Sequence, residues 1–295
     1  MANRRSLFGS RRGRRGIGSM RVGPGRGIPV RLVPIILFAL YLGYYWFANQ
    51  ETVPVTGRSQ LVDISRDQEM ALGLQSYREI LGTSDVMQNG EVVDQVRAIG
   101  AKLVDAARAE GLDPGFEWEF NVIRSDQANA FALPGGKVAV YTGLLPVAEN
   151  ADGLSAIMGH EIAHAIARHG AERMAYQKLV RIGSMVATVV VGDMGYSAQR
   201  AVQGALGVGS QFGVLLPFSR KHESEADFIG LRLLARACYQ PSEAPLLWER
   251  MGSNSSGSGT PNEFMSTHPS PETRIEQFNE WMSDAEQLRR ENCAG

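Results

Sequence analysis

The chain has 295 residues, of which 44% are hydrophobic, and this is enough for a packed core in one large or two small domains. Its formal net charge of −1 hides a division, because the first 50 residues carry nine arginines and no acid, whereas the remainder carries 21 basic and 31 acidic residues. This division indicates two environments and excludes a uniformly basic, nucleic-acid-binding chain, so no nucleic-acid partner is predicted.

The N-terminus is predicted to be a disordered tail followed by a membrane anchor. Residues 1–31 are rich in Arg, Gly and Ser and contain no acid, so we expect a disordered cytoplasmic tail. Residues 32–50 are uncharged and lie near the lower length limit for a helix that crosses a bilayer. A cleaved signal peptide is the alternative, but bulky Trp46 and Phe47 and the lack of a small-x-small motif favour a retained transmembrane anchor.

The arginine-rich side of such an anchor should remain in the cytoplasm, which places everything after Glu51 across the membrane. In a bacterium, this predicts the inner membrane with the folded domain in the periplasm. Because an arginine-rich, acid-free N-terminus also resembles a mitochondrial presequence, the mitochondrial inner membrane is the alternative.

A linker over residues 51–64 and one folded domain over residues 65–292 are expected next. Ser65 and Gln68 have the spacing of a capping box, which predicts a helix to about residue 81. Residues 92–109 have one apolar face, which predicts a second helix before Gly111. Both helices are expected to be scaffold.

Two regions have the pattern of strands. Residues 116–122 alternate apolar and polar side chains, which predicts a half-buried strand. Residues 130–141 form two short extended runs around a Pro-Gly-Gly turn. Either run could present a sheet edge that pairs with a peptide, and an ordinary hairpin packed on the core is the alternative.

The sequence HEIAH at residues 160–164 is the motif around which the chain is organised. On a helix, His160 and His164 lie about 40° and one turn apart, so both imidazoles can reach one ion. Glu161 projects at a neighbouring angle, where it can act as a general base on a metal-activated water without being a ligand. A helix with two ordinary histidines is the alternative.

The helix that carries this motif can be capped by Asn150 or Asp152 and is predicted to continue to about Gln177. His169 would lie about 180° from His160 on such a helix, so we expect it to be structural or solvent-facing. Residues 179–217 are Gly-rich and apolar, and their length favours packed helices over membrane-surface helices.

Another helix is predicted over residues 219–230, with Glu223 and Asp227 one turn apart on one face. A site with two histidines needs a third protein ligand and an open position for water, and a carboxylate from a second helix can supply that ligand. We predict that Glu223 is the ligand and that Asp227 accepts the distal N–H of a ligating histidine. Glu225 points about 200° away from Glu223. The alternative is a solvated charged face.

The C-terminal region contains a Gly/Ser-rich stretch at residues 251–260, which is expected to be flexible, and a helix predicted at about residues 271–289. Between them, His268 could be a solvent-exposed loop residue, or it could reach the metal or a developing oxyanion. Cys238 and Cys293 form no CxxC motif, which argues against a thiolate metal site. A disulfide and two free thiols are equally compatible with the sequence.

Four motifs occur in the chain in a fixed order: NAFALPGG at 129–136, HEIAH at 160–164, ESEAD at 223–227 and HPSPETR at 268–274. Together they resemble the membrane-linked gluzincin metallopeptidases, a family that includes HtpX, the CAAX prenyl proteases, the mitochondrial overlapping-activity protease and the BepA-like periplasmic proteases. The resemblance covers about residues 65–285. HtpX and the CAAX proteases span the membrane several times, whereas this sequence has one convincing span.

The resemblance implies a mostly helical α+β fold, a zincin-like metalloprotease domain with a small sheet, preceded by one transmembrane helix. It implies one zinc ion bound by His160, His164 and Glu223, with Glu161 as catalytic base and acid and Asp227 as the carboxylate behind a ligand. It further implies three other assignments: a substrate-pairing strand made of Val138, Ala139, Val140 and Tyr141; a switch in which His268 moves onto zinc; and an oxyanion or regulatory role for Arg274.

The predicted function is a membrane-anchored zinc endopeptidase that hydrolyses misfolded or misassembled envelope proteins. One alternative is a chaperone-like protein that captures unfolded segments by strand pairing and has latent protease activity. A second alternative is a structural zinc protein in which His268 is a permanent fourth ligand.

Overall fold

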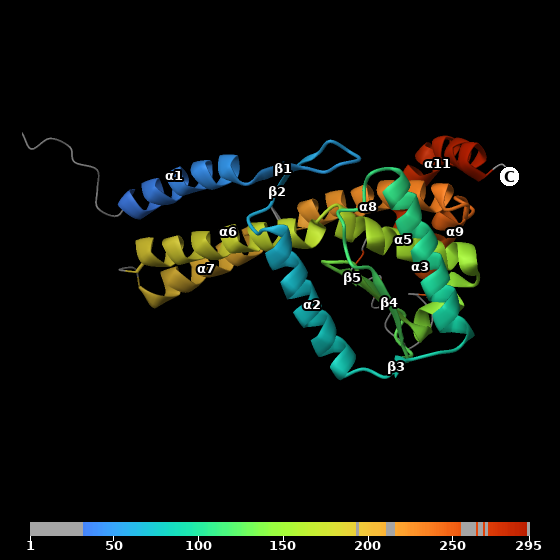
Figure 1. Ribbon diagram of the computed structural model, residues 1–295. Coiled ribbons are helices and arrows are strands. Elements are labelled where there is room, and N and C mark those ends of the chain that lie inside the picture. The colour runs from blue at the N-terminus through green and yellow to red at the C-terminus, as the bar shows by residue number, and fades with distance from the viewer. Residues whose placement is uncertain are drawn as a thin grey trace, which may run out of the picture.

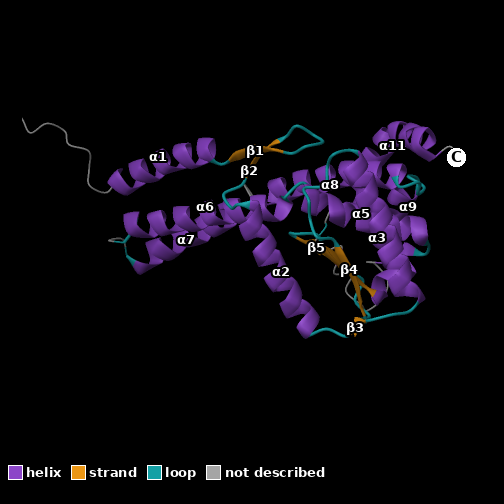
Figure 2. Ribbon diagram, viewed as in Figure 1, coloured by secondary structure: helices purple, strands orange, loops and turns teal. Residues whose placement is uncertain are grey.

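A computed structural model of the chain describes residues 32–192, 195–210, 216–254, 264, 268 and 271–293. The tail predicted at residues 1–31 and most of the flexible stretch predicted at residues 251–260 lie outside the described residues. The described part is mostly helical with small sheets, which agrees with the predicted α+β class (Figure 2).

The elements follow one another along the chain as coloured in Figure 1. They are α1 (Val33–Ala48), β1 (Gln50–Thr52), β2 (Ser59–Leu61), α2 (Arg66–Gly82), β3 (Val86–Met87), α3 (Glu91–Ala109), β4 (Glu119–Ile123), β5 (Ala130–Leu133), β6 (Lys137–Tyr141), the 3₁₀ helix η2 (Thr142–Leu144), α4 (Leu145–Ala148), α5 (Ala151–Ile166), α6 (His169–Val190), α7 (Tyr196–Ser210), α8 (Leu216–Arg236), α9 (Glu243–Asn254) and α11 (Pro271–Cys293).

Helix α1 occupies the stretch predicted to be a membrane anchor and has 16 residues. Within the described ranges, no helix combines the length and the apolar character needed to cross a bilayer. Helix α1 packs along α6, where Tyr45, Leu61 and Ala175 form a small buried cluster. In Figure 1, α1, α6 and α7 lie side by side and extend away from the sheet and the remaining helices.

The predicted linker at residues 51–64 contains most of a short hairpin. Strands β1 and β2 pair in antiparallel fashion, with Gln50 opposite Leu61. The hairpin is held against the body of the protein because Val53 and Leu61 are buried. Its turn carries Arg58, whose contacts are described below.

The larger sheet has the strand order β3-β4-β6-β5. Strand β6 lies inside this sheet, because it pairs with β4 in parallel and with β5 in antiparallel fashion. Both edges of β6 are therefore occupied, and the prediction that residues 138–141 pair with a substrate strand is wrong for backbone pairing. The β5–β6 hairpin was predicted, and its turn uses Gly135 and Gly136 at φ +85° and +82°. Among the described residues, the outer edges of β5 and of the two-residue strand β3 pair with no further strand.

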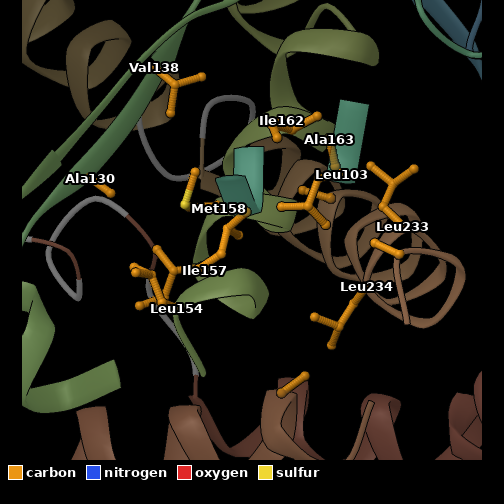
Figure 3. Packing of buried hydrophobic residues seen from close by; sticks show 14 of the residues in the cluster. Leu103, Ala130, Val138, Leu154, Ile157, Met158, Ile162, Ala163, Leu233 and Leu234 are labelled. Carbon is orange, nitrogen blue, oxygen red and sulfur yellow. The ribbon is translucent and has the colours of Figure 1, made fainter. Parts of the chain in front are cut away.

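The main core forms where α5 crosses α3, α8 and the sheet (Figure 3). Leu103 on α3, Met158 and Ile162 on α5 and Leu233 on α8 are fully buried there. Helices α5 and α8 approach closely at their glycines, because a Cβ atom on Gly230 would lie 3.0 Å from the Gly159 carbonyl carbon. This close approach brings the motif on α5 next to the carboxylates of α8.

Helix α5 ends at Ile166, so the prediction that it continues to about Gln177 is wrong. The chain turns at Arg168, which has φ +58° and ψ +32°, and α6 begins at the next residue. A left-handed conformation costs a non-glycine residue about 1–2 kcal/mol. Contacts of the buried Arg168 side chain offset this cost, because its Nε lies 2.7 Å from Glu69 Oε2 and it donates to the Ile64 carbonyl at 3.1 Å.

In the C-terminal half, α8 packs against α5 and α11. Within residues 179–217, where packed helices were predicted, the described parts of α6 and α7 pack against one another. Cys238 and Cys293 form a disulfide that joins the ends of α8 and α11. Helix α9 continues to Asn254, and Met251 is buried, so the expected flexible stretch does not begin at residue 251.

Candidate metal centre

Two histidines reach the centre of the site from one helix. Helix α5 begins at a capped end, because the Asn150 side chain accepts a hydrogen bond from the Gly153 amide at 2.8 Å. His160 and His164 follow on one face, with their rings 4.6 Å apart. His160 is buried and His164 is nearly so. The local sequence thus fixes the relative placement of the two imidazoles.

Glu223 from α8 and His268 join these two histidines. Each of the four residues offers one atom that could bind a metal ion, and these candidate ligand atoms all lie within 4.8 Å of one another. His160 Nε2 is 3.0 Å from His164 Nε2 and 3.2 Å from His268 Nδ1. Glu223 Oε2 is 3.3 Å from His160 Nε2 and 2.8 Å from His268 Nδ1. Ligands around a zinc ion with bonds of about 2.0–2.1 Å lie about 3.3 Å apart at tetrahedral angles, so this donor set fits a zinc ion.

Glu161 lies beside the four ligands and belongs to none of the pairs above. Its Oε2 accepts a hydrogen bond from the Ala132 amide of β5 at 3.2 Å. Its Oε1 is buried without a hydrogen-bond partner among the described residues, with His268 Nε2 at 3.5 Å. A buried carboxylate oxygen without a partner is costly unless a donor such as water reaches it. This is the placement predicted for a general base.

Asp227 and Arg274 support the first histidine. Asp227 Oδ1 lies 2.9 Å from His160 Nδ1, as predicted for a carboxylate that fixes the tautomer of a ligand. The buried Arg274 donates to both carboxylate oxygens of Asp227 and lies 3.2 Å from Glu223 Oε2. Its guanidinium stacks over the Trp248 ring at 3.3 Å. The described contacts of Arg274 therefore neutralise the two acids, whereas the sequence had suggested an oxyanion or regulatory role.

The surroundings keep the two acids ionised. Burial raises the pKa of Glu223, but His164, His160 and His268 outweigh it and hold this pKa far below its usual value. Burial likewise raises the pKa of Asp227, and Arg274 and His160 lower it below the usual value. For His160, burial and Arg274 lower the pKa, whereas Asp227 and Glu223 raise it to about 9. The carboxylates thus favour a positive charge at this point, which a divalent cation can supply by displacing a proton.

A second group of polar side chains lies behind His164. His169 Nδ1 is 2.8 Å from His164 Nδ1, and His169 Nε2 is 2.9 Å from Glu225 Oε2. Burial, followed by the nearby His164 and His222, lowers the pKa of His169 well below its usual value. His169 is therefore a neutral, buried side chain that contacts the candidate ligand His164 and lies outside the group of four candidate ligands.

This second group is completed by His222, Glu172 and Arg58. The His222 ring stacks on the His169 ring at 4.1 Å, and His222 Nε2 lies 2.8 Å from Glu172 Oε2. Arg58, from the β1–β2 turn, binds both Glu172 and Glu225 at 2.7 Å. All five histidines of the chain thus lie in one continuous cluster.

The sequence predicted three ligands, namely His160, His164 and Glu223, together with Glu161 and Asp227. It left open whether His268 reaches the metal, and it gave no prediction of this second group. The sequence contained one indication of the second group, because helix geometry places Glu225 on the opposite side of its helix from Glu223. That geometry directs Glu225 away from the metal and toward His169. The missing information was the helix break at Arg168, which turns His169 back toward His164.

Comparisons with known proteins agree with this geometry. A model of the family described as "Peptidase family M48" matches residues 92–282. The "Mitochondrial metalloendopeptidase OMA1" of Schizosaccharomyces pombe is 37% identical over 249 residues, which cover 84% of this chain and 71% of that protein. The protein of the same name from Saccharomyces cerevisiae is 32% identical, with 83% and 72% covered. The "Beta-barrel assembly-enhancing protease" of Escherichia coli is 28% identical, with 85% of this chain and 52% of that protein covered.

Proposed function

The chain belongs to peptidase family M48 and is a metalloendopeptidase, and from that premise we propose that its metal is zinc, held by His160, His164 and Glu223. The observation that carries the proposal is the gathering of four possible ligand atoms within 4.8 Å of one another, beside Glu161 Oε1, which has no hydrogen-bond partner among the described residues. When bound, zinc supplies a Lewis acid that polarises a carbonyl and lowers the pKa of water to about 7.

The chain's own residues carry out the proton transfers in this proposal. Glu161 takes a proton from the attacking water through its free Oε1 and later delivers it to the leaving amine. Asp227 keeps the proton of His160 on Nδ1, so that Nε2 faces the ligand cluster. Arg274 forms an ion pair with both Asp227 and Glu223 and keeps Asp227 ionised. The result is a cut peptide without a covalent enzyme intermediate.

We propose β5 in place of β6 as the strand that pairs with substrate. Its outer edge is free in the sheet order, and the Ala132 amide on that edge points at Glu161 Oε2. An extended peptide added there would pair through its backbone, which tolerates many sequences. Such pairing supports unfolded or misassembled proteins as substrates, because only extended segments can add to a sheet edge.

His268 supplies the fourth candidate ligand atom, which supports the predicted switch in which this residue binds zinc and keeps the enzyme inactive. Water and substrate can enter only when this imidazole moves away. A permanently bound His268 would instead support the structural zinc protein, and strand capture without cleavage would support the chaperone-like alternative.

We further propose that the folded domain spans residues 65–292 and is linked to a membrane through residues 32–50, where α1 lies. Its proposed role is protein quality control at a membrane, with misfolded or misassembled envelope proteins as substrates; one relative is named for its part in beta-barrel assembly. Two locations follow from the basic N-terminus: a bacterial inner membrane with a periplasmic domain, or the mitochondrial inner membrane. Two relatives named mitochondrial support a mitochondrial location, and a third relative comes from the bacterium Escherichia coli.

The test is digestion of unfolded casein by the full-length chain in detergent, with and without a chelator. Glu161→Gln should abolish cleavage while zinc remains bound, because the amide cannot take a proton. His268→Ala should increase the cleavage rate if that imidazole closes the site. Cleavage that persists both with chelator and in Glu161→Gln would contradict the zinc mechanism. Loss of zinc in His268→Ala would favour the structural zinc protein.

A further inference from the structure

The second zinc-binding histidine has an unusual partner for its distal nitrogen. His164 Nε2 faces the ligand cluster, where it lies 3.6 Å from Glu223 Oε1. His164 Nδ1 faces His169 Nδ1 at 2.8 Å. The distal nitrogen of His160 faces a carboxylate directly, whereas that of His164 faces another imidazole.

The positions of the protons in this chain of groups follow from the ligand role of His164. A neutral imidazole that offers the lone pair of Nε2 to a metal carries its proton on Nδ1. His169 Nδ1 must then accept that hydrogen bond, which leaves the proton of His169 on Nε2. His169 Nε2 can donate only to an acceptor, and Glu225 Oε2 lies 2.9 Å away. One set of tautomers therefore satisfies each of these contacts.

The far end of the chain is held by a cation. Arg58 Nε donates to Glu225 Oε2 at 2.8 Å, and its terminal nitrogens donate to Glu172 at 2.9 and 2.7 Å. Glu225 is buried, so its charge needs a paired cation. Arg58 therefore holds the Glu225 carboxylate in place, and Glu225 in turn orients His169. Arg58 belongs to the hairpin that directly follows α1.

We propose that His169 is a positioning residue for the metal site, which holds His164 in the ligating tautomer and is itself fixed by Glu225 and Arg58. This inference rests on the proposed zinc site and extends it to three residues outside the ligand set. The break at Arg168 makes the arrangement possible, because on a continuous helix residues five apart lie about 140° from one another.

The test compares two buried, stacked histidines in the full-length chain in detergent. His169→Leu removes the acceptor for His164, whereas His222→Leu removes a ring of equal size whose described hydrogen bond goes to Glu172. Zinc affinity is measured by competition with a chelating dye. Loss of a group behind a ligand typically weakens metal binding about 10–100-fold, and we expect this for His169→Leu and less than about threefold for His222→Leu. Equal losses in both variants, or no loss in His169→Leu, would overturn the proposal.

Two further variants separate positioning from packing. His169→Asn places an amide oxygen near the site of the lost Nδ1, so it should restore part of the zinc affinity of His169→Leu. Glu225→Gln keeps the side-chain volume and should weaken zinc binding and alter the visible spectrum of the cobalt-loaded chain. If His169→Leu fails to fold, an unchanged affinity in both of these variants would contradict the proposal. A wild-type chain that bound no zinc would instead contradict the proposed function.

Discussion

Replacement of Gly230 by alanine would test the close contact between α5 and α8 that aligns the site. The new Cβ would lie 3.0 Å from both the Gly159 carbonyl carbon and the His160 amide nitrogen, whereas ordinary contacts begin at 3.4 Å. The neighbouring atoms are backbone, so the helices must separate by about 0.4 Å. Metal–ligand distances tolerate only about 0.2 Å. We expect overpacking to cost about 1–3 kcal/mol in unfolding free energy, together with weaker zinc binding.

Urea unfolding of the full-length chain, with saturating zinc and with chelator, would measure both effects. Gly204→Ala on α7 is the matched control, because nothing lies within 4 Å of its added Cβ. That variant should gain up to about 1 kcal/mol from helix propensity. An unfolding free energy and a zinc affinity of Gly230→Ala that equal those of the wild type would refute the claim that this crossing positions the ligands.

Three other substitutions probe the scaffold. Tyr77→Phe removes a buried hydroxyl that donates a hydrogen bond to the Val138 carbonyl at 3.1 Å. This should lower the free energy of unfolding, measured in urea, by about 1–2 kcal/mol. An unchanged free energy would mean that this hydrogen bond contributes nothing to stability. Burial raises the pKa of Asp113, but donors that include the Trp118 indole outweigh it and lower this pKa below the ordinary value of 3.8. The ionised Asp113 carboxylate therefore stabilises the fold fully above pH 3.8, and this stabilisation is lost as pH falls through the lower pKa of the folded state. Asp113→Asn should therefore be destabilising at pH 7, and thermal melts should show the difference from wild type shrinking below about pH 4; a constant difference would contradict this. Cys293→Ser opens a loop of 55 residues and should cost up to about 4 kcal/mol in denaturant unfolding, whereas an unchanged midpoint would exclude a stabilising disulfide.

Features that depend on nearby residues could be predicted from the sequence. Helix α2 begins at the capping box of Ser65 and Gln68. Helix α3 covers the residues whose apolar periodicity predicted a helix. The pair His160 and His164 is fixed by helix geometry alone. Glu223 was predicted because zinc chemistry requires a third ligand, and family membership confirms the resemblance on which that choice also relied.

Features that depend on distant residues could not be predicted. The break at Arg168 is stabilised by Glu69, which lies on another helix, so no local signal marks it. Strand β5 lies at the edge of the sheet because β4 pairs with β6, although β5 stands between those two strands in the sequence. Sequence pattern identified both runs of the hairpin, but it could not decide which of them remained unpaired.

The gathering of all five histidines in one cluster gives the protein a built-in spectroscopic reporter. If only histidine is isotopically labelled, every imidazole signal in a nuclear magnetic resonance spectrum arises from the catalytic region, with no background from elsewhere in the chain. Nitrogen shifts distinguish the protonated from the lone-pair nitrogen of each ring. A single sample could therefore follow metal loading and tautomers, and it would test the proposed displacement of His268 during substrate binding.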